Sequence, residues 1–226
     1  MKAFDYSLVK DPQYFCDNRM EAHSDHVYYR DGNEMQTAVQ DGTETSFRYS
    51  LNGLWKFHYA RNYKSAVQGF EKEDYCCYDW DDIHVPAHIQ MEGYDAPQYA
   101  NVQYPWEGHE EIYPGQIPER FNPVASYVKY FTVPEHMKGK RLFISFQGAE
   151  SGLALWLNGA FVGYSEDSFT PSEFELTDYL KDGQNKLAAQ VFKWTSKQLV
   201  RRSGLLPFLR NLQRCVSLYS SGYSRI

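Results

Sequence analysis

The sequence predicts an all-β protein, an antiparallel β-sandwich that follows an extended N-terminal arm. Two observations support this prediction. Apolar residues make up 42% of the 226 residues and aromatic residues 17%, which is enough to build a core and argues against global disorder. Short alternating runs also recur along the chain, each bounded by Gly, Pro, Asn or Asp. Many short strands with such punctuation are typical of antiparallel sandwiches.

Six runs of four to nine residues carry the strand prediction, at 54–59, 125–133, 141–146, 152–157, 161–164 and 186–193. Asn158-Gly159 separates two of these runs and predicts a type I′ hairpin, because both residues tolerate positive φ. Residues 171–176 predict one short helical turn, capped by Ser172 or Thr170.

Two further segments differ from the strand pattern. Residues 1–50 are polar and irregular, with Asp-Gly pairs as turn signals, and predict an arm with little regular structure. The sandwich domain is then expected at 51–196. Residues 84–123 contain six prolines. Such a long, stiff excursion inside a sandwich is uncommon unless it builds a surface or a site.

Composition excludes several classes of partner. The formal net charge of −6 argues against nucleic acid, which requires a basic face. No run of 18 apolar residues is present, so no membrane partner is expected. The N-terminus lacks an apolar signal core. The four cysteines form no CxxC pair, which favours reduced thiols. We therefore expect a cytoplasmic protein.

Charge changes abruptly near Ser196. Residues 197–226 hold six basic residues and no acidic one, whereas the preceding 196 residues hold 17 basic and 29 acidic residues. A switch from −12 to +6 indicates a compositional boundary, and residues 197–226 are interpreted as an aberrant basic tail.

Several segments, in order, resemble the N-terminal sugar-binding domain of family 2 glycoside hydrolases of the β-galactosidase type. They are NR at 18–19, AH at 22–23, NGLWKF at 52–57, 85–94, PQYANVQYP at 97–105, NGAFVGYSEDS at 158–168, PSEF at 171–174 and NKL at 185–187. Each motif alone is weak, but their number and order are specific. The resemblance covers roughly residues 11–196.

The resemblance implies a galactose-binding-like jelly roll packed beside a separate catalytic barrel. It also implies a cytoplasmic enzyme that cleaves terminal β-galactosides and forms homo-oligomers. Asn101 matches the family's sugar-contacting asparagine, and a side-chain amide suits this role because it both donates and accepts hydrogen bonds. From the residues alone, a turn-capping role for Asn101 is about equally supported; the resemblance favours the sugar contact.

The resemblance assigns no catalytic or metal-binding residue to this chain. Retaining hydrolysis needs two carboxyl groups about 5 Å apart, and in this family both come from the barrel. The family's magnesium ligands belong to the barrel as well. We interpret the four carboxylates that lie close together in the sequence as structural: Glu166, Asp167, Glu173 and Glu175. The spacing of His84, His88 and His109 fits no compact metal motif.

The tail departs from the family pattern, which calls for Glu-Asp-Gln-Asp and later Ser-Gly-Ile-Phe-Arg-Asp-Val, with a sodium-binding acid. One allowed set of codons for residues 197–217, read one base later, encodes SSWCEDQDFFRFSGIFRDVY. We therefore predict that the tail is translated out of frame. The sandwich is then expected to lack a closing strand and to present an open edge.

The leading hypothesis is a non-catalytic N-terminal fragment of a β-galactosidase. Two alternatives stay open, a free-standing carbohydrate-binding module and an interaction domain that assembles with a separate catalytic chain. A β-glucuronidase or β-mannosidase parent is a lesser alternative, because the Asn-Val-Gln-Tyr-Pro segment favours a galactosidase.

Overall fold

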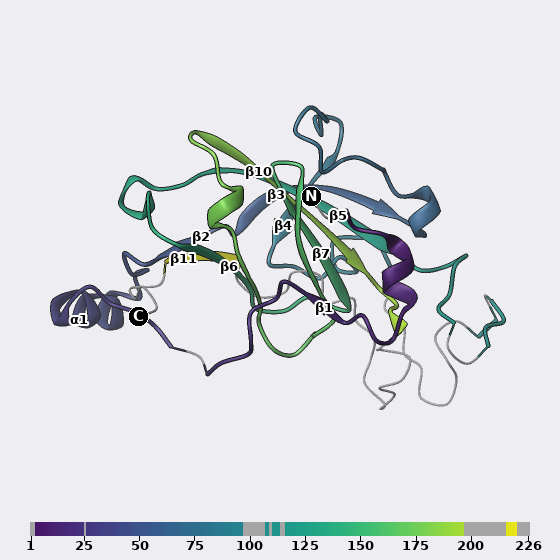
Figure 1. Cartoon of the computed structure of the whole chain (residues 1–226), viewed down its shortest axis with the longest axis horizontal. Helices are drawn as coiled ribbons and strands as arrows, with labels where there is room; N and C mark the ends of the chain where they lie inside the picture. Colours follow the sequence, from purple (N-terminus) through teal and green to yellow (C-terminus); the bar gives the residue numbers. More distant parts are fainter. Residues whose placement is uncertain are drawn as a thin grey trace.

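Two antiparallel β-sheets packed face to face form the body of the protein (Figure 1), as the sequence predicts. The structure is a computed structural model that describes residues 3–24, 26–96, 107–108, 110–113, 116–196 and 216–220. Within these residues the larger sheet has seven strands and the smaller has four. No helix of the described part is long and apolar enough to cross a bilayer.

The larger sheet has the order β1-β8-β7-β10-β5-β3-β4. Its strands are β1 (Cys16–Asp17), β3 (Gly53–Ala60), β4 (Asp81–Val85), β5 (Val124–Thr132), β7 (Gly152–Leu157), β8 (Ala160–Ser165) and β10 (Gln184–Phe192). The smaller sheet has the order β2-β11-β6-β9, with β2 (Arg48–Ser50), β6 (Leu142–Phe146), β9 (Ser172–Glu175) and β11 (Val216–Ser220). Short 3₁₀ turns are η1 (Tyr6–Lys10), η2 (Tyr63–Ser65), η3 (Glu135–Met137) and η4 (Thr177–Tyr179).

Both faces of the larger sheet are buried. Along β10, Leu187, Ala189 and Val191 enter the core between the two sheets. Ala188 and Phe192 enter a second apolar cluster on the opposite face. This alternation follows from the two-residue period of a strand, and it explains why β10 is apolar on both sides.

The predicted hairpin at Asn158-Gly159 is confirmed. Both residues have positive φ, 52° and 81°, as a type I′ turn requires. The Asn158 side chain also donates to the carbonyl of Tyr179 (2.9 Å) and accepts from the amide of Lys186 (2.9 Å). The turn therefore ties β7 and β8 to the start of β10.

The predicted helical turn at 171–176 is wrong, because Ser172–Glu175 forms strand β9. Its residues pair with β6 in antiparallel register, Phe174 opposite Ile144. Phe174 is fully buried. Burial of this ring in the core and the ladder to β6 outweigh the local preference for a capped turn.

The arm has more regular structure than its turn signals indicate. The two Asp-Gly pairs flank helix α1 (Gly32–Asp41), which projects from one end of the sandwich (Figure 1). Asp31 is its N-cap and accepts from the amide of Glu34, while Gly42 ends the helix with φ 65°. Residues predicted to form loops are therefore helix caps.

The expected open edge is also wrong, since Val216–Ser220 forms β11 between β2 and β6. Leu218 lies opposite Tyr49 on one side and Ile144 on the other. Its side chain is fully buried in the core between the sheets. This short segment supplies the apolar residue that a central strand needs, whatever frame encodes it.

We predict that Leu218→Ala lowers the free energy of unfolding by about 2–5 kcal/mol, because it removes a buried side chain and leaves a cavity. Urea unfolding followed by tryptophan fluorescence measures the change. Leu54→Ala is the matched control, since Leu54 is 53% exposed and the loss should be small. Equal stability of the Leu218 variant and the parent chain would contradict a packed β11.

Candidate functional site

The predicted sugar contact, Asn101, lies outside the described residues. Its role therefore stays a prediction. The described residues on either side of its segment show how the Pro-rich excursion is attached to the sandwich. Both attachments are made at the same end of β10.

A buried ion pair holds the first attachment. Lys193, directly after β10, places its Nζ 2.7 Å from an Asp95 carboxylate oxygen, and the two side chains are only 2% and 6% exposed. Tyr59 donates a longer hydrogen bond of 3.5 Å to the other Asp95 oxygen. Burial lowers the pKa of Lys193, while the hydrogen bond to Asp95 opposes that shift. The carboxylate is therefore the counter-ion that keeps a buried ammonium group charged.

Asn122 makes the second attachment at the other end of the excursion. It is fully buried, and its side chain donates to the carbonyl of Trp194 and accepts from the amide of Trp194, each at 2.9 Å. Its amide nitrogen also donates to the Tyr6 hydroxyl at 3.2 Å. The excursion thus leaves and re-enters the sandwich beside residues 193 and 194.

Two of the sequence-adjacent carboxylates have clear structural partners. Glu166 is buried and accepts from the Tyr164 hydroxyl at 2.7 Å. Asp167 accepts from the Thr170 hydroxyl (2.7 Å) and lies 3.4 Å from Arg19, which fastens the arm to the end of β8. Hydrogen bonds from residues 169 and 170, together with Arg19, lower the pKa of Asp167 against the opposing effect of burial.

The other two carboxylates lie on β9. Glu175 forms a two-point ion pair with Arg141, the residue directly before β6, at 2.8 and 2.6 Å. Glu173 is buried, and its Oε2 lies 2.6 Å from Nε2 of His23 and 3.0 Å from the Tyr219 hydroxyl. Burial and Glu173 both raise the pKa of that tyrosine. Sequence analysis missed this cluster, because its members come from the arm, β9 and β11.

The described residues hold no group of three or more His, Cys, Asp or Glu side chains arranged to bind a metal ion. Of the histidines in the excursion, His84 is exposed on β4, and His109 lies outside the described residues. Three described cysteines are free thiols, and of these Cys77 is buried. Burial raises the pKa of the Cys77 thiol.

The two-sheet sandwich and its sequence motifs indicate a sugar-binding domain of a glycoside hydrolase. A comparison with family models indicates the same class. Residues 48–221 match the family described as glycosyl hydrolases family 2, sugar binding domain. The chain belongs to this family. The match extends beyond Ser196 and includes all of β11.

The sequence relatives are β-galactosidases. The chain is 52% identical over 187 residues to a β-galactosidase of Halalkalibacterium halodurans and 46% identical over 190 residues to one of Streptococcus thermophilus. These matches cover 83% and 84% of this chain but 18% of each relative. A β-galactosidase large subunit of Leuconostoc lactis is 40% identical over 212 residues, covering 88% of this chain and 33% of that protein.

Solved structures support the fold. A Bacteroides uniformis β-glucuronidase superposes with a TM-score of 0.56 at 20% identity, covering 76% of this chain and 18% of that chain. A Bifidobacterium dentium β-glucuronidase gives a TM-score of 0.54 at 20% identity, covering 79% and 30%. At this identity the likeness concerns the sandwich alone.

We predict that Asp95→Asn lowers the free energy of unfolding by about 3–5 kcal/mol, because it leaves the Lys193 ammonium buried without a counter-ion. Adding Lys193→Met to the variant should recover much of that loss. Chemical denaturation of the four proteins in a double-mutant cycle measures the coupling. Glu135→Gln, which breaks an exposed ion pair with Lys138, is the control and should leave stability unchanged within error. A simple sum of the two single effects would mean that the pair contributes no coupling.

Proposed function

We propose that this chain is the sugar-binding sandwich of a β-galactosidase, and that the parent enzyme hydrolyses terminal β-galactosides in a catalytic barrel encoded elsewhere. The observation that carries the proposal is the 52% identity to a β-galactosidase over 83% of this chain. The sandwich contributes structure and one sugar contact. The two catalytic carboxylates and the magnesium ligands belong to the remainder of the parent enzyme, and the sodium-binding acid belongs to the segment that the family pattern places after Ser196.

Asn101 is proposed to reach from the sandwich to the galactose in the barrel. The attachments at Asp95 and Asn122 support this role, because they fix both ends of the excursion against residues 193 and 194. A contact that must be held at one distance from a sugar needs such a supported base. By the same reasoning, we propose that the excursion at residues 84–123 contacts the β-galactoside substrate. A cytoplasmic homo-oligomer is proposed for the parent enzyme.

An interaction domain that assembles with a separate catalytic chain is the second candidate. Two observations favour it. One relative is named a large subunit, and α1 exposes Met35 and Val39, which are 45% and 72% exposed one turn apart. Co-purification of this chain with a galactosidase chain that lacks its own sandwich supports this candidate. Binding of galactose by this chain alone, with no such partner, supports a free-standing carbohydrate-binding module instead.

The Asn101 proposal can be tested in a chimera in which residues 1–196 replace the matching part of the Halalkalibacterium halodurans enzyme. We expect the chimera to hydrolyse p-nitrophenyl β-galactoside, and Asn101→Ala to lower kcat/KM by tenfold or more, equivalent to about 1.4 kcal/mol. Gln103→Ala in the same segment is the matched control and should retain kcat/KM. If both variants behave alike, Asn101 makes no specific sugar contact. If the chimera folds but the unmodified form has no activity, the galactosidase proposal itself fails.

The out-of-frame hypothesis makes a prediction about the gene. Sequencing the coding DNA from the codon of Trp194 onward should show Glu-Asp-Gln-Asp in a neighbouring frame, followed by a region that encodes a barrel. A single open frame with the printed residues and no such neighbouring frame would show that residues 197–226 are genuine.

A further inference from the structure

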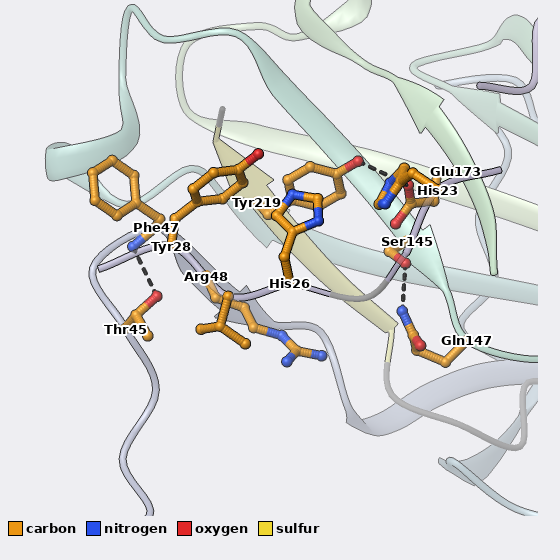
Figure 2. A pocket seen from close by; sticks show the side chains of 11 residues that line it. His23, His26, Tyr28, Thr45, Phe47, Arg48, Ser145, Gln147, Glu173 and Tyr219 are labelled. Atoms are coloured by element: carbon orange, nitrogen blue, oxygen red, sulfur yellow. Dashed lines mark hydrogen bonds and ion pairs between the residues drawn. The ribbon is translucent and has the colours of Figure 1, made fainter. Parts of the chain in front are cut away.

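A cavity of about 340 Å³ lies between the arm and the smaller sheet (Figure 2). β2, β6, β9 and β11 contribute the floor, and the arm contributes His23, His26, Val27, Tyr28, Thr45 and Phe47. All its lining residues belong to the described part of the chain. The volume is at the lower end of the range of about 300–1,000 Å³ that is usual for small-molecule sites, and a single pyranose ring fits such a space.

Arg48 supplies a positive charge at this cavity. Its backbone is fixed in β2, opposite Tyr219 of β11, and its amide donates to the carbonyl of Thr45 at 3.0 Å. Its guanidinium group makes no ion pair or hydrogen bond with another described residue. By contrast, Arg19 and Arg141 are both paired with carboxylates. A guanidinium is a planar fork that matches a carboxylate or a phosphate.

The one acidic side chain among the lining residues already has polar partners. Glu173 contacts His23 and the Tyr219 hydroxyl through the same oxygen, as described above. The other ring nitrogen of His23, Nδ1, lies 3.0 Å from the carbonyl of Ser24. Glu173 is thus in contact with the arm through His23 and with β11 through Tyr219. Among the described lining residues, Arg48 is the side chain whose charge has no such partner.

His26 adds a second polar group. Its Nδ1 lies 2.9 Å from the carbonyl of Ser24, and a carbonyl only accepts, so Nδ1 carries the proton. Nε2 is left to face a ligand as an acceptor, or as a donor when the ring is protonated. Gln147 donates to the Ser145 hydroxyl at 2.7 Å, which orients an amide at the edge of the same cavity. These groups match the hydroxyls of a sugar.

Aromatic rings complete the lining. Tyr28, Phe47 and Tyr219 line the cavity, and Tyr219 is held in place by a stacked contact with Phe143 at 5.3 Å between ring centroids. Figure 2 shows these rings together with Arg48 and His26. Aromatic walls offer apolar surface to the CH faces of a pyranose, whereas a bare inorganic anion has no apolar surface to place there.

We propose that this cavity binds a small anionic sugar, a hexuronate or a hexose phosphate, with Arg48 holding the anionic group. The proposal does not depend on the galactosidase assignment. Arg48 supplies the charge, the rings supply the walls, and His26 and Gln147 supply hydrogen bonds to hydroxyl groups. The order of preference among ligands follows directly: anionic sugar, then neutral sugar or free anion.

Isothermal titration of the full chain with D-galacturonate, D-galactose and inorganic phosphate tests this order. We expect D-galacturonate to bind at least tenfold more tightly than either of the other two probes. Arg48→Gln should weaken D-galacturonate binding at least tenfold. Arg141→Gln, which removes one arginine charge directly before β6 and outside the cavity, is the matched control and should leave the affinity within twofold.

A second variant separates a loss of binding from a loss of folding. Gln147→Glu places a carboxylate at the rim without removing a group from β2, and it should also weaken D-galacturonate at least tenfold. Circular dichroism and thermal unfolding establish that each variant is folded. Equal affinity for D-galactose and D-galacturonate, or unchanged affinity in both folded variants, would overturn the proposal. Phosphate binding as tight as that of D-galacturonate would do so too, because the sugar frame would then contribute nothing.

Discussion

Both faces of the seven-stranded sheet are apolar and must be shielded from solvent. Most other features of the protein follow from this requirement. Its central strands, β7 and β10, alternate side chains between two apolar clusters. The smaller sheet covers one face. The other face needs its own cover, and the arm and the segment after β3 supply it with aromatic rings such as Phe4, Tyr6 and Phe70. Phe4 packs edge-on against Trp156, with 5.5 Å between ring centroids. The start of the arm is therefore part of the core and not an appendage, which is why it is ordered without long secondary structure of its own.

Strand positions could be predicted because side chains alternate between the two faces of a strand. This two-residue pattern is visible in the sequence wherever one or both faces are buried. The predicted hairpin also held, because Asn158 and Gly159 carry their own conformational signal. The failures have a common physical cause. Asp31 and Gly42 are equally suited to turns and to helix caps, and only the residues between them decide which occurs. At β9, the buried Phe174 and its partner strand decide a conformation that local propensity left open.

The site was less predictable than the fold, because its contacts join residues that are far apart in the chain. Asp95 and Lys193 are separated by 98 positions, and His23 and Glu173 by 150. No local pattern marks either pair, and a buried lysine looks like a surface lysine in the sequence. Asn101 was assigned through a family resemblance and not through a local physical signal. The cavity at Arg48 could not have been foreseen either, since arm and sheet meet there only after both sheets have formed.

Strand β11 bears on the hypothesis that the tail is translated out of frame. A segment with no selected sequence has no reason to place an apolar residue at one inward position between two strands, yet Leu218 is fully buried there. The family match also continues to residue 221, across this strand. The sequence of the coding DNA decides whether the out-of-frame hypothesis holds for residues 197–226. On either outcome Val216–Ser220 supplies the strand between β2 and β6. The acidic segment that the family pattern places after Ser196 is absent from the printed sequence in both cases.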